Sequence, residues 1–255
     1  VLKTVTDIRD VPLTIGAKNV RIPALNGKNV VLTIDRNIQA RTERALADGI
    51  ARSGATNASA IVIDPSIGKV LAMANLPTYD PAALNTVTNA ADFNNDVISN
   101  PYEPGSDIKT FTIATGIDKG VITPDSTYEN TDRIQVDDIT ISNASKGHTG
   151  TRTMQFALNW SLNTGMVTVA QRLGNGSQIT RGARDTMYDY FHNRFRLGET
   201  TGIELANEAG GTIVSPTEAE GNAVRYSNMA FGQGMDATML QVASGFGAIV
   251  NGGTY

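Results

Sequence analysis

The sequence contains no cysteine and only two histidines among its 255 residues. Without cysteine, disulfides, thiolate nucleophiles and cysteine-ligated zinc or iron-sulfur centres are excluded. The two histidines, His148 and His192, lie in polar stretches flanked by glycine or arginine, which favours neither a Ser-His-Asp triad nor a histidine metal site. We therefore expect a reaction that needs no metal and no cofactor.

Long apolar runs and basic clusters are also missing. No stretch of about 18 or more apolar residues occurs, and the first residues lack the pattern of a signal peptide. Any membrane anchor is therefore expected outside these residues. The net charge of -4 and the absence of a Lys/Arg-rich run argue against nucleic acid as a partner, while a hydrophobic content of 40% is enough for a globular core.

The N-terminal part reads as a linker followed by a strand and a helix. Residues 1–28 alternate short β-branched runs with glycine and proline, which is typical of extended linker strands. The apolar run 29–34 predicts a strand. Asp35 then stands where an N-cap is needed, and the helix that it begins should end by Ser53-Gly54.

The rest of the chain reads as a hairpin followed mainly by helices. Apolar runs at 60–63 and 70–74, separated by a turn containing proline and glycine, predict a β-hairpin. The Asn- and Thr-rich stretch 77–100 predicts a long surface connection. Apolar periodicity then predicts helices over 106–118, about 153–172, about 179–195 and 236–250.

Ser106-Asp107-Ile108-Lys109 has a form that can activate a serine. Positions i and i+3 share one helix face, so an unprotonated Lys109 can accept the hydroxyl proton of Ser106. The preceding Pro104-Gly105 turn would place the serine at a helix start, where the dipole favours developing negative charge. A second copy, Ser66 to Lys69, is expected to be only a turn. By itself, Ser106 could equally be an N-cap beside a solvated lysine.

A second motif, Ser161-Leu162-Asn163, favours the interpretation of Ser106 as a nucleophile over its interpretation as an N-cap. Both polar residues cap helices well, so alone they would read as a helix-entry turn. Together with the Ser106 motif, preceded by Glu-Pro-Gly, they resemble the penicillin-binding transpeptidases, most closely the class B, monofunctional branch. The resemblance extends over residues 31–35, 64–74, 77–81, 201–208 and 231–253.

The resemblance implies a role for each of four site residues. Ser106 would be the acylated nucleophile and Lys109 the general base. Ser161 would relay a proton to the leaving nitrogen, and Asn163 would hydrogen-bond the substrate amide. Asp107 departs from the family, which usually has a small neutral residue there; we expect its carboxylate to point out of the cleft.

The resemblance also implies the architecture. It predicts an α+β fold, with an antiparallel sheet backed by helices and an all-helical subdomain at about 112–230, all within a transpeptidase domain at 29–255. Residues 1–28 would lead in from an N-terminal pedestal. The family's Lys-Thr/Ser-Gly motif is expected beyond Gly252-Gly253 and does not occur before Tyr255. The sheet is therefore expected to be incomplete in this chain, and these 255 residues alone should be impaired as an enzyme.

The implied function is a peptidoglycan D,D-transpeptidase that cross-links stem peptides and binds β-lactams. Its setting would be the extracytoplasmic face of the bacterial cytoplasmic membrane, in a membrane-anchored protein of cell-wall and cell-shape biosynthesis that works with a membrane glycosyltransferase. Two alternatives stay open. One is a β-lactamase or D,D-carboxypeptidase, in which water resolves the acyl-enzyme, and the other is a non-catalytic sensor that binds muropeptides or β-lactams.

Overall fold

The computed structural model describes residues 2–3, 20–21 and 25–255, and the chain divides into two compact units, 1–32 and 33–255. In the first unit, β1 (Leu2–Lys3) pairs antiparallel with β2 (Val20–Arg21). Most of the predicted linker, residues 1–28, lies outside the described residues.

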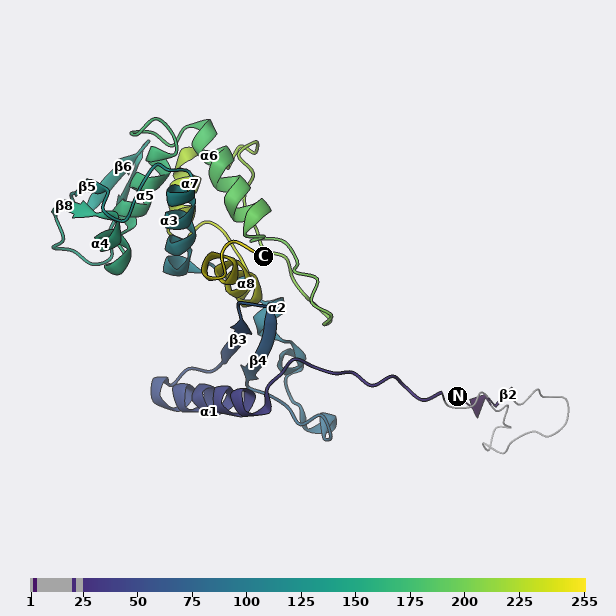
Figure 1. Cartoon of the computed structure of the whole chain (residues 1–255). Coiled ribbons are helices and arrows are strands. Elements are labelled where there is room, and N and C mark those ends of the chain that lie inside the picture. The colour runs from purple at the N-terminus through teal and green to yellow at the C-terminus, as the bar shows by residue number, and fades with distance from the viewer. Residues whose placement is uncertain (1, 4–19, 22–24) are drawn as a thin grey trace. The chain divides into compact units, whose positions relative to one another are not determined.

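The second unit begins with a helix and a hairpin, as predicted. Helix α1 (Arg36–Ser53) is capped by the Asp35 carboxylate, which accepts hydrogen bonds from two amides of the first turn, and ends at Gly54 with φ of 72°. Strands β3 (Ala58–Asp64) and β4 (Lys69–Leu76) pair antiparallel. Helix α1 packs against both strands and lies beneath them in Figure 1.

The strand predicted at 29–34 is wrong. Residues 25–35 have no regular structure, and the apolar side chains of this run at positions 30–32 are exposed. Among the described residues, two hydrogen bonds tie the end of this segment to β4: Thr33 Oγ1 donates to Val70 O at 2.6 Å, and Asp35 N donates to Leu71 O at 2.9 Å. A strand needs a ladder of backbone bonds, and β-branched composition alone does not supply one.

The connection between the hairpin and the candidate site is only partly irregular. It contains two short 3-10 helices, η1 (Leu84–Thr86) and η2 (Ala90–Phe93), and ends in α2 (Asp96–Ser99). Helix α2 buries Val97 and Ile98 against Leu240 of α8 (Met239–Val250) and against the apolar side chains of β3. This small core fixes the chain immediately before the candidate nucleophile.

The larger core surrounds α3 (Ile108–Asp118), near the middle of the upper part of Figure 1. It is built from helices and two antiparallel strand pairs. The helices are α4 (Met154–Asn159), α5 (Asn163–Arg172), α6 (Arg181–Tyr188), the π-helical turn η4 (Asp189–Arg194) and α7 (Ala223–Met229). Strand β5 (Thr127–Asn130) pairs with β8 (Gly150–Thr153), and β6 (Arg133–Val136) pairs with β7 (Ile139–Ser142).

These strand pairs correct the expectation of an all-helical subdomain at about 112–230. The fold class itself, α+β with small antiparallel sheets and helices, is confirmed. Each of the four strands has only four residues, the lower limit of the alternating runs from which a strand can be predicted. Among the described residues, no helix has both the length and the apolar character needed to cross a membrane.

The predicted helix boundaries are close to the observed ones. Helix α8 begins at Met239 and not at Asp236, because Thr238 forms a capping box with Gln241. The helical stretch predicted at about 153–172 is interrupted at Trp160–Leu162, between α4 and α5. The predicted Ser161 motif lies in that interruption.

Candidate active site

Ser106 lies in a single 3-10 turn, η3 (Gly105–Asp107), which runs directly into α3. The turn depends on a close approach of two glycines. Gly105 N donates to Gly232 O at 2.9 Å, and a Cβ added to Gly232 would lie 1.8 Å from Gly105 O. The Ser106 side chain is thereby presented at the surface.

The residues immediately before this turn are held by the same segment that contains Gly232. Tyr102 and Ala237 exchange two backbone hydrogen bonds of 3.1 and 3.0 Å. The Glu103 carboxylate accepts a hydrogen bond from Gly234 N at 2.7 Å. The nucleophile's position is therefore fixed by contacts with residues more than 100 positions later in the chain.

Lys109 lies in the first turn of α3, and only 2% of it is exposed. Both hydrogen bonds that its Nζ makes with the described residues go to Ser161, to the backbone O at 2.6 Å and to Oγ at 2.8 Å. No carboxylate of the described residues forms an ion pair with it. Burial lowers the pKa of Lys109 to about 8, so the neutral amine is accessible near neutral pH.

Ser161 connects the lysine to the nucleophile. It lies between α4 and α5 with φ of 54°, a left-handed conformation that is uncommon for serine. Its Oγ donates to Ser106 Oγ at 3.0 Å. The three side chains thus form one chain of hydrogen bonds from Lys109 through Ser161 to Ser106, an arrangement in which a proton can move between the nucleophile and a buried amine.

Asn163, the fourth predicted residue, is the first residue of α5. It lies beside the chain of hydrogen bonds from Lys109 to Ser106 and is not part of it. Its Nδ2 donates to Ser142 O at 3.0 Å, which leaves the amide oxygen available. The structure therefore joins Ser106 and Lys109 through Ser161 and places Asn163 two residues after Ser161.

The second Ser-X-X-Lys copy is a turn, as predicted. The Ser66 amide and hydroxyl both donate to the Asp64 carboxylate, at 2.9 and 2.6 Å. These bonds lower the pKa of Asp64. Lys69 begins β4 and its side chain is not brought to Ser66 by a helix. The chemistry of the two copies differs because only Ser106 precedes a helix.

Asp107 is exposed, next to the nucleophile. Burial raises the pKa of the Tyr102 hydroxyl, and the nearby Asp107 charge adds to that effect. No hydrogen bond ties the Asp107 side chain to the other described residues. Its carboxylate is thus near the site without being part of the hydrogen-bond chain.

A group of buried polar residues beside α5 was missed by the sequence reasoning. Asn130, Asp132, Asn143 and Thr164 are each at most 9% exposed and are joined by hydrogen bonds. The usable signal was weak: three Asn or Asp residues spaced between short β-branched runs, which equally suit ordinary turns. We call this group the Asn143 cluster.

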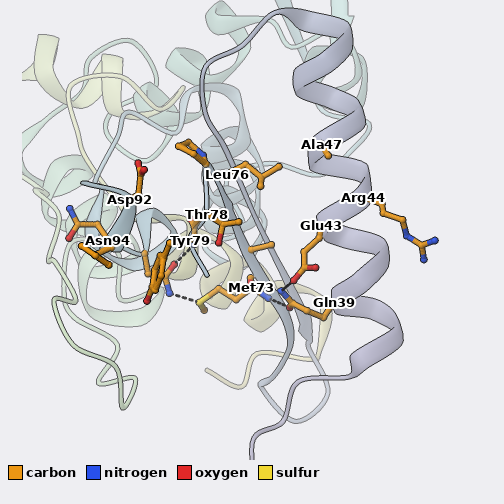
Figure 2. A pocket seen from close by; sticks show the side chains of 15 residues that line it. Gln39, Glu43, Arg44, Ala47, Met73, Leu76, Thr78, Tyr79, Asp92 and Asn94 are labelled. Atoms are coloured by element: carbon orange, nitrogen blue, oxygen red, sulfur yellow. Dashed lines mark hydrogen bonds between the residues drawn. The ribbon is translucent and has the colours of Figure 1, made fainter. Parts of the chain in front are cut away.

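The hollow drawn in Figure 2 lies away from these residues. It has a volume of about 490 Å³ and is formed by α1, the end of β4 and the following connection. Gln39 braces its wall, donating to Met73 O and accepting from Met73 N, both at 2.9 Å. It includes none of the four site residues, of which Ser106 and Ser161 are exposed.

The family model of the penicillin-binding protein transpeptidase domain matches residues 58–255. Among curated proteins, penicillin-binding protein PbpB of Mycobacterium tuberculosis is 31% identical over 238 residues, covering 93% of this chain and 33% of the relative. Peptidoglycan D,D-transpeptidase FtsI of Escherichia coli is 29% identical, covering 89% and 36%. The chain thus spans about a third of the length of these relatives.

Solved structures show the same fold. Penicillin-binding protein 3 of M. tuberculosis in complex with ampicillin superimposes with a TM-score of 0.80 at 32% identity, covering 91% of this chain and 49% of that one. Penicillin-binding protein 2X of Streptococcus thermophilus gives 0.79 at 26% identity, covering 98% and 35%. By the match of the family model and by these relatives, the chain belongs to the penicillin-binding protein transpeptidase family, among its class B members.

Proposed function

We propose that this chain carries the catalytic residues of a peptidoglycan D,D-transpeptidase that works through an acyl-enzyme on Ser106. The observation that supports it most is the hydrogen-bond chain from Ser106 through Ser161 to the buried Lys109. Lys109 has no ion-pair partner among the described residues and a pKa of about 8. A lysine in that state can take up and return a proton within one catalytic cycle.

In the proposed acylation, Ser106 Oγ attacks the carbonyl carbon of the D-Ala-D-Ala bond of a stem peptide. Its proton moves to Ser161 Oγ while the Ser161 proton moves to the neutral Lys109 Nζ. Collapse of the tetrahedral intermediate breaks the C–N bond, and the proton returns from Lys109 through Ser161 to the leaving D-Ala nitrogen. An ester on Ser106 and free D-Ala result.

Deacylation reverses the order. The amine of a second stem peptide attacks the ester carbonyl and loses a proton toward Ser161 and Lys109, and Ser106 Oγ leaves with that proton. The product is the cross-linking amide. The position of Ser106 in the turn that leads directly into the 11-residue α3 helps both steps, because a helix N-terminus favours the negative charge of each intermediate.

Asn163 is proposed to bind the substrate amide through its free oxygen, since its Nδ2 is already engaged with Ser142 O. Residues 29–255 would form the transpeptidase domain, with 1–28 leading in from a pedestal. We further propose β-lactams as acylating inhibitors, an extracytoplasmic location, a membrane anchor outside these residues and a membrane glycosyltransferase as partner. The mycobacterial relative in complex with ampicillin supports the β-lactam part.

Labelling of the natural full-length protein with a fluorescent penicillin tests the proposal. Wild type and Ser66→Ala should be labelled equally, and Ser106→Ala should not be labelled, with the adduct mapped to the peptide containing Ser106. Incubation with a stem-peptide donor and an amine acceptor then separates the alternatives. Hydrolysis without amide formation would indicate a carboxypeptidase or β-lactamase, and a stable adduct with no turnover of stem peptide would indicate a sensor.

A further inference from the structure

Helix α5 carries Asn163 at its first position and follows Ser161 directly, yet it has no N-cap of its own. Its N-cap position is occupied by Leu162, a fully buried apolar residue whose side chain cannot accept a hydrogen bond. The first amides of a helix need acceptors, and Ser, Thr, Asp or Asn normally supply one at this position. The helix end that bears the second motif therefore depends on an acceptor from elsewhere.

Asn143, the residue after the end of β7, supplies that acceptor. Its Oδ1 accepts hydrogen bonds from Thr164 N at 3.0 Å and from Thr164 Oγ1 at 3.1 Å, across 21 positions of sequence. The preceding residue, Ser142, accepts the Asn163 side-chain amide on its carbonyl oxygen at 3.0 Å. Ser142, the last residue of β7, and Asn143, which follows it, thus hold two consecutive residues of α5.

The Asn143 side chain is itself fixed, because Asp132 and Asn130 accept both hydrogen bonds that its Nδ2 can donate. Asn143 Nδ2 donates to Asp132 Oδ1 and to Asn130 Oδ1, both at 3.1 Å. The second carboxylate oxygen of Asp132 accepts from Gly147 N at 2.8 Å. These bonds, led by the one from Asn143, lower the pKa of Asp132. An amide held in this way cannot rotate, so its oxygen stays aimed at Thr164.

We propose that Asn143 is a positioning residue for acyl transfer: it caps α5 from outside the helix and so sets the place of Ser161 and Asn163 relative to Ser106. The inference rests on the proposed function. The link is geometric. Ser161 provides both oxygen atoms that hold Lys109 Nζ and also the hydroxyl that reaches Ser106, so a shift of the helix end changes three catalytic distances at once.

The test compares Asn143→Leu with a matched control, Asn175→Leu. Asn175 follows the other end of α5, and its Oδ1 also accepts backbone hydrogen bonds, from the amides of Ser177 and Gln178 at 3.1 and 2.8 Å. Two quantities are measured on the full-length protein: the acylation rate per titrated active site at saturating fluorescent penicillin, and hydrogen exchange at the amide of Thr164. Counting active sites by titration removes any effect of partial unfolding.

We expect Asn143→Leu to lose protection of the Thr164 amide and to acylate about 10- to 100-fold more slowly per active site, as expected for a displaced reacting group. Asn175→Leu should acylate at the wild-type rate. A wild-type rate per site in folded Asn143→Leu would overturn the inference, because a residue that only stabilises the fold would lower the number of active sites and leave the rate of each unchanged.

Thr164→Val covers the case in which Asn143→Leu does not fold. It keeps the hydrogen bond from the backbone N–H of residue 164 to Asn143 Oδ1. It removes the hydrogen bonds from the Thr164 hydroxyl to Asn143 and Asn130, of 3.1 and 2.9 Å. We expect protection to be retained and acylation to slow by about three- to tenfold; an unchanged rate would contradict the inference. If instead wild type is not labelled, or Ser106→Ala still is, the proposed function itself fails.

Discussion

The pH dependence of acylation follows from the burial of Lys109. An ordinary lysine has a pKa of 10.5, whereas burial lowers that of Lys109 to about 8. Only the neutral amine can accept the Ser106 proton, so the acylation rate should follow the neutral fraction. That fraction is roughly 1% at pH 6, roughly 9% at pH 7 and about half at pH 8 for a pKa of about 8.

The expected profile is therefore steep and then flat. Between pH 6 and pH 8 the acylation rate should rise about 50-fold, and above pH 8 it should gain no more than about twofold. The measurement is stopped-flow fluorescence with a fluorescent penicillin in excess, from pH 5.5 to 9.5, on the full-length protein. Breakdown of the penicillin without protein is subtracted, and circular dichroism shows that the fold is unchanged over this range.

Two outcomes would refute the reasoning. A rate that keeps rising tenfold per pH unit up to pH 9.5 would mean that Lys109 titrates as an ordinary, hydrated lysine. A rate independent of pH would mean that proton transfer to Lys109 does not limit acylation. In the first case burial would not lower the pKa of Lys109, and in the second the contacts of Lys109 with Ser161 would support the fold and not the chemistry.

Three substitutions test other parts of the site by the same assay. Lys109→Arg should abolish acylation although the positive charge is retained, since arginine does not become neutral; a near wild-type rate would show a purely electrostatic role. Asp107→Thr should change the rate by less than about tenfold, because the carboxylate is exposed, and a gain of several hundredfold would mean that it obstructs ligands. Gly232→Ala should slow acylation at least about 100-fold, because the added Cβ meets the backbone before Ser106. Gly234→Ala, also at positive φ, meets the side chains of Arg225 and Asn228 and no backbone atom, and should cost less; equal losses would contradict a specific role for the glycine contact.

The parts of the fold that were predictable are those with local causes. Asp35 precedes a helix and accepts bonds from its first amides, and Gly54 ends that helix in a left-handed conformation. The turn between β3 and β4 is set by its own proline and glycine. In each case the residue types act within a few positions, so the sequence contains the whole explanation.

The parts that were not predictable depend on distant partners. The run 29–34 has the composition of a strand, but no ladder of backbone bonds forms along it in the described part of the chain. Conversely, β6 and β7 have only four residues each and were not predicted as strands, yet Ser142 at the end of β7 and Asn143 after it determine where α5 begins. Pairing and capping across the fold leave little trace in one sequence.

The same distinction applies within the site. The Ser-X-X-Lys spacing correctly predicts that Ser106 and Lys109 lie within one turn of each other, and it suggests a direct contact between them. In the structure, Lys109 reaches Ser106 through Ser161, whose left-handed backbone lies in a break between two helices. The base is thus effective only when the second motif is in place. The two motifs form one proton path, and the position of α5 controls that path as much as the helix that carries the nucleophile.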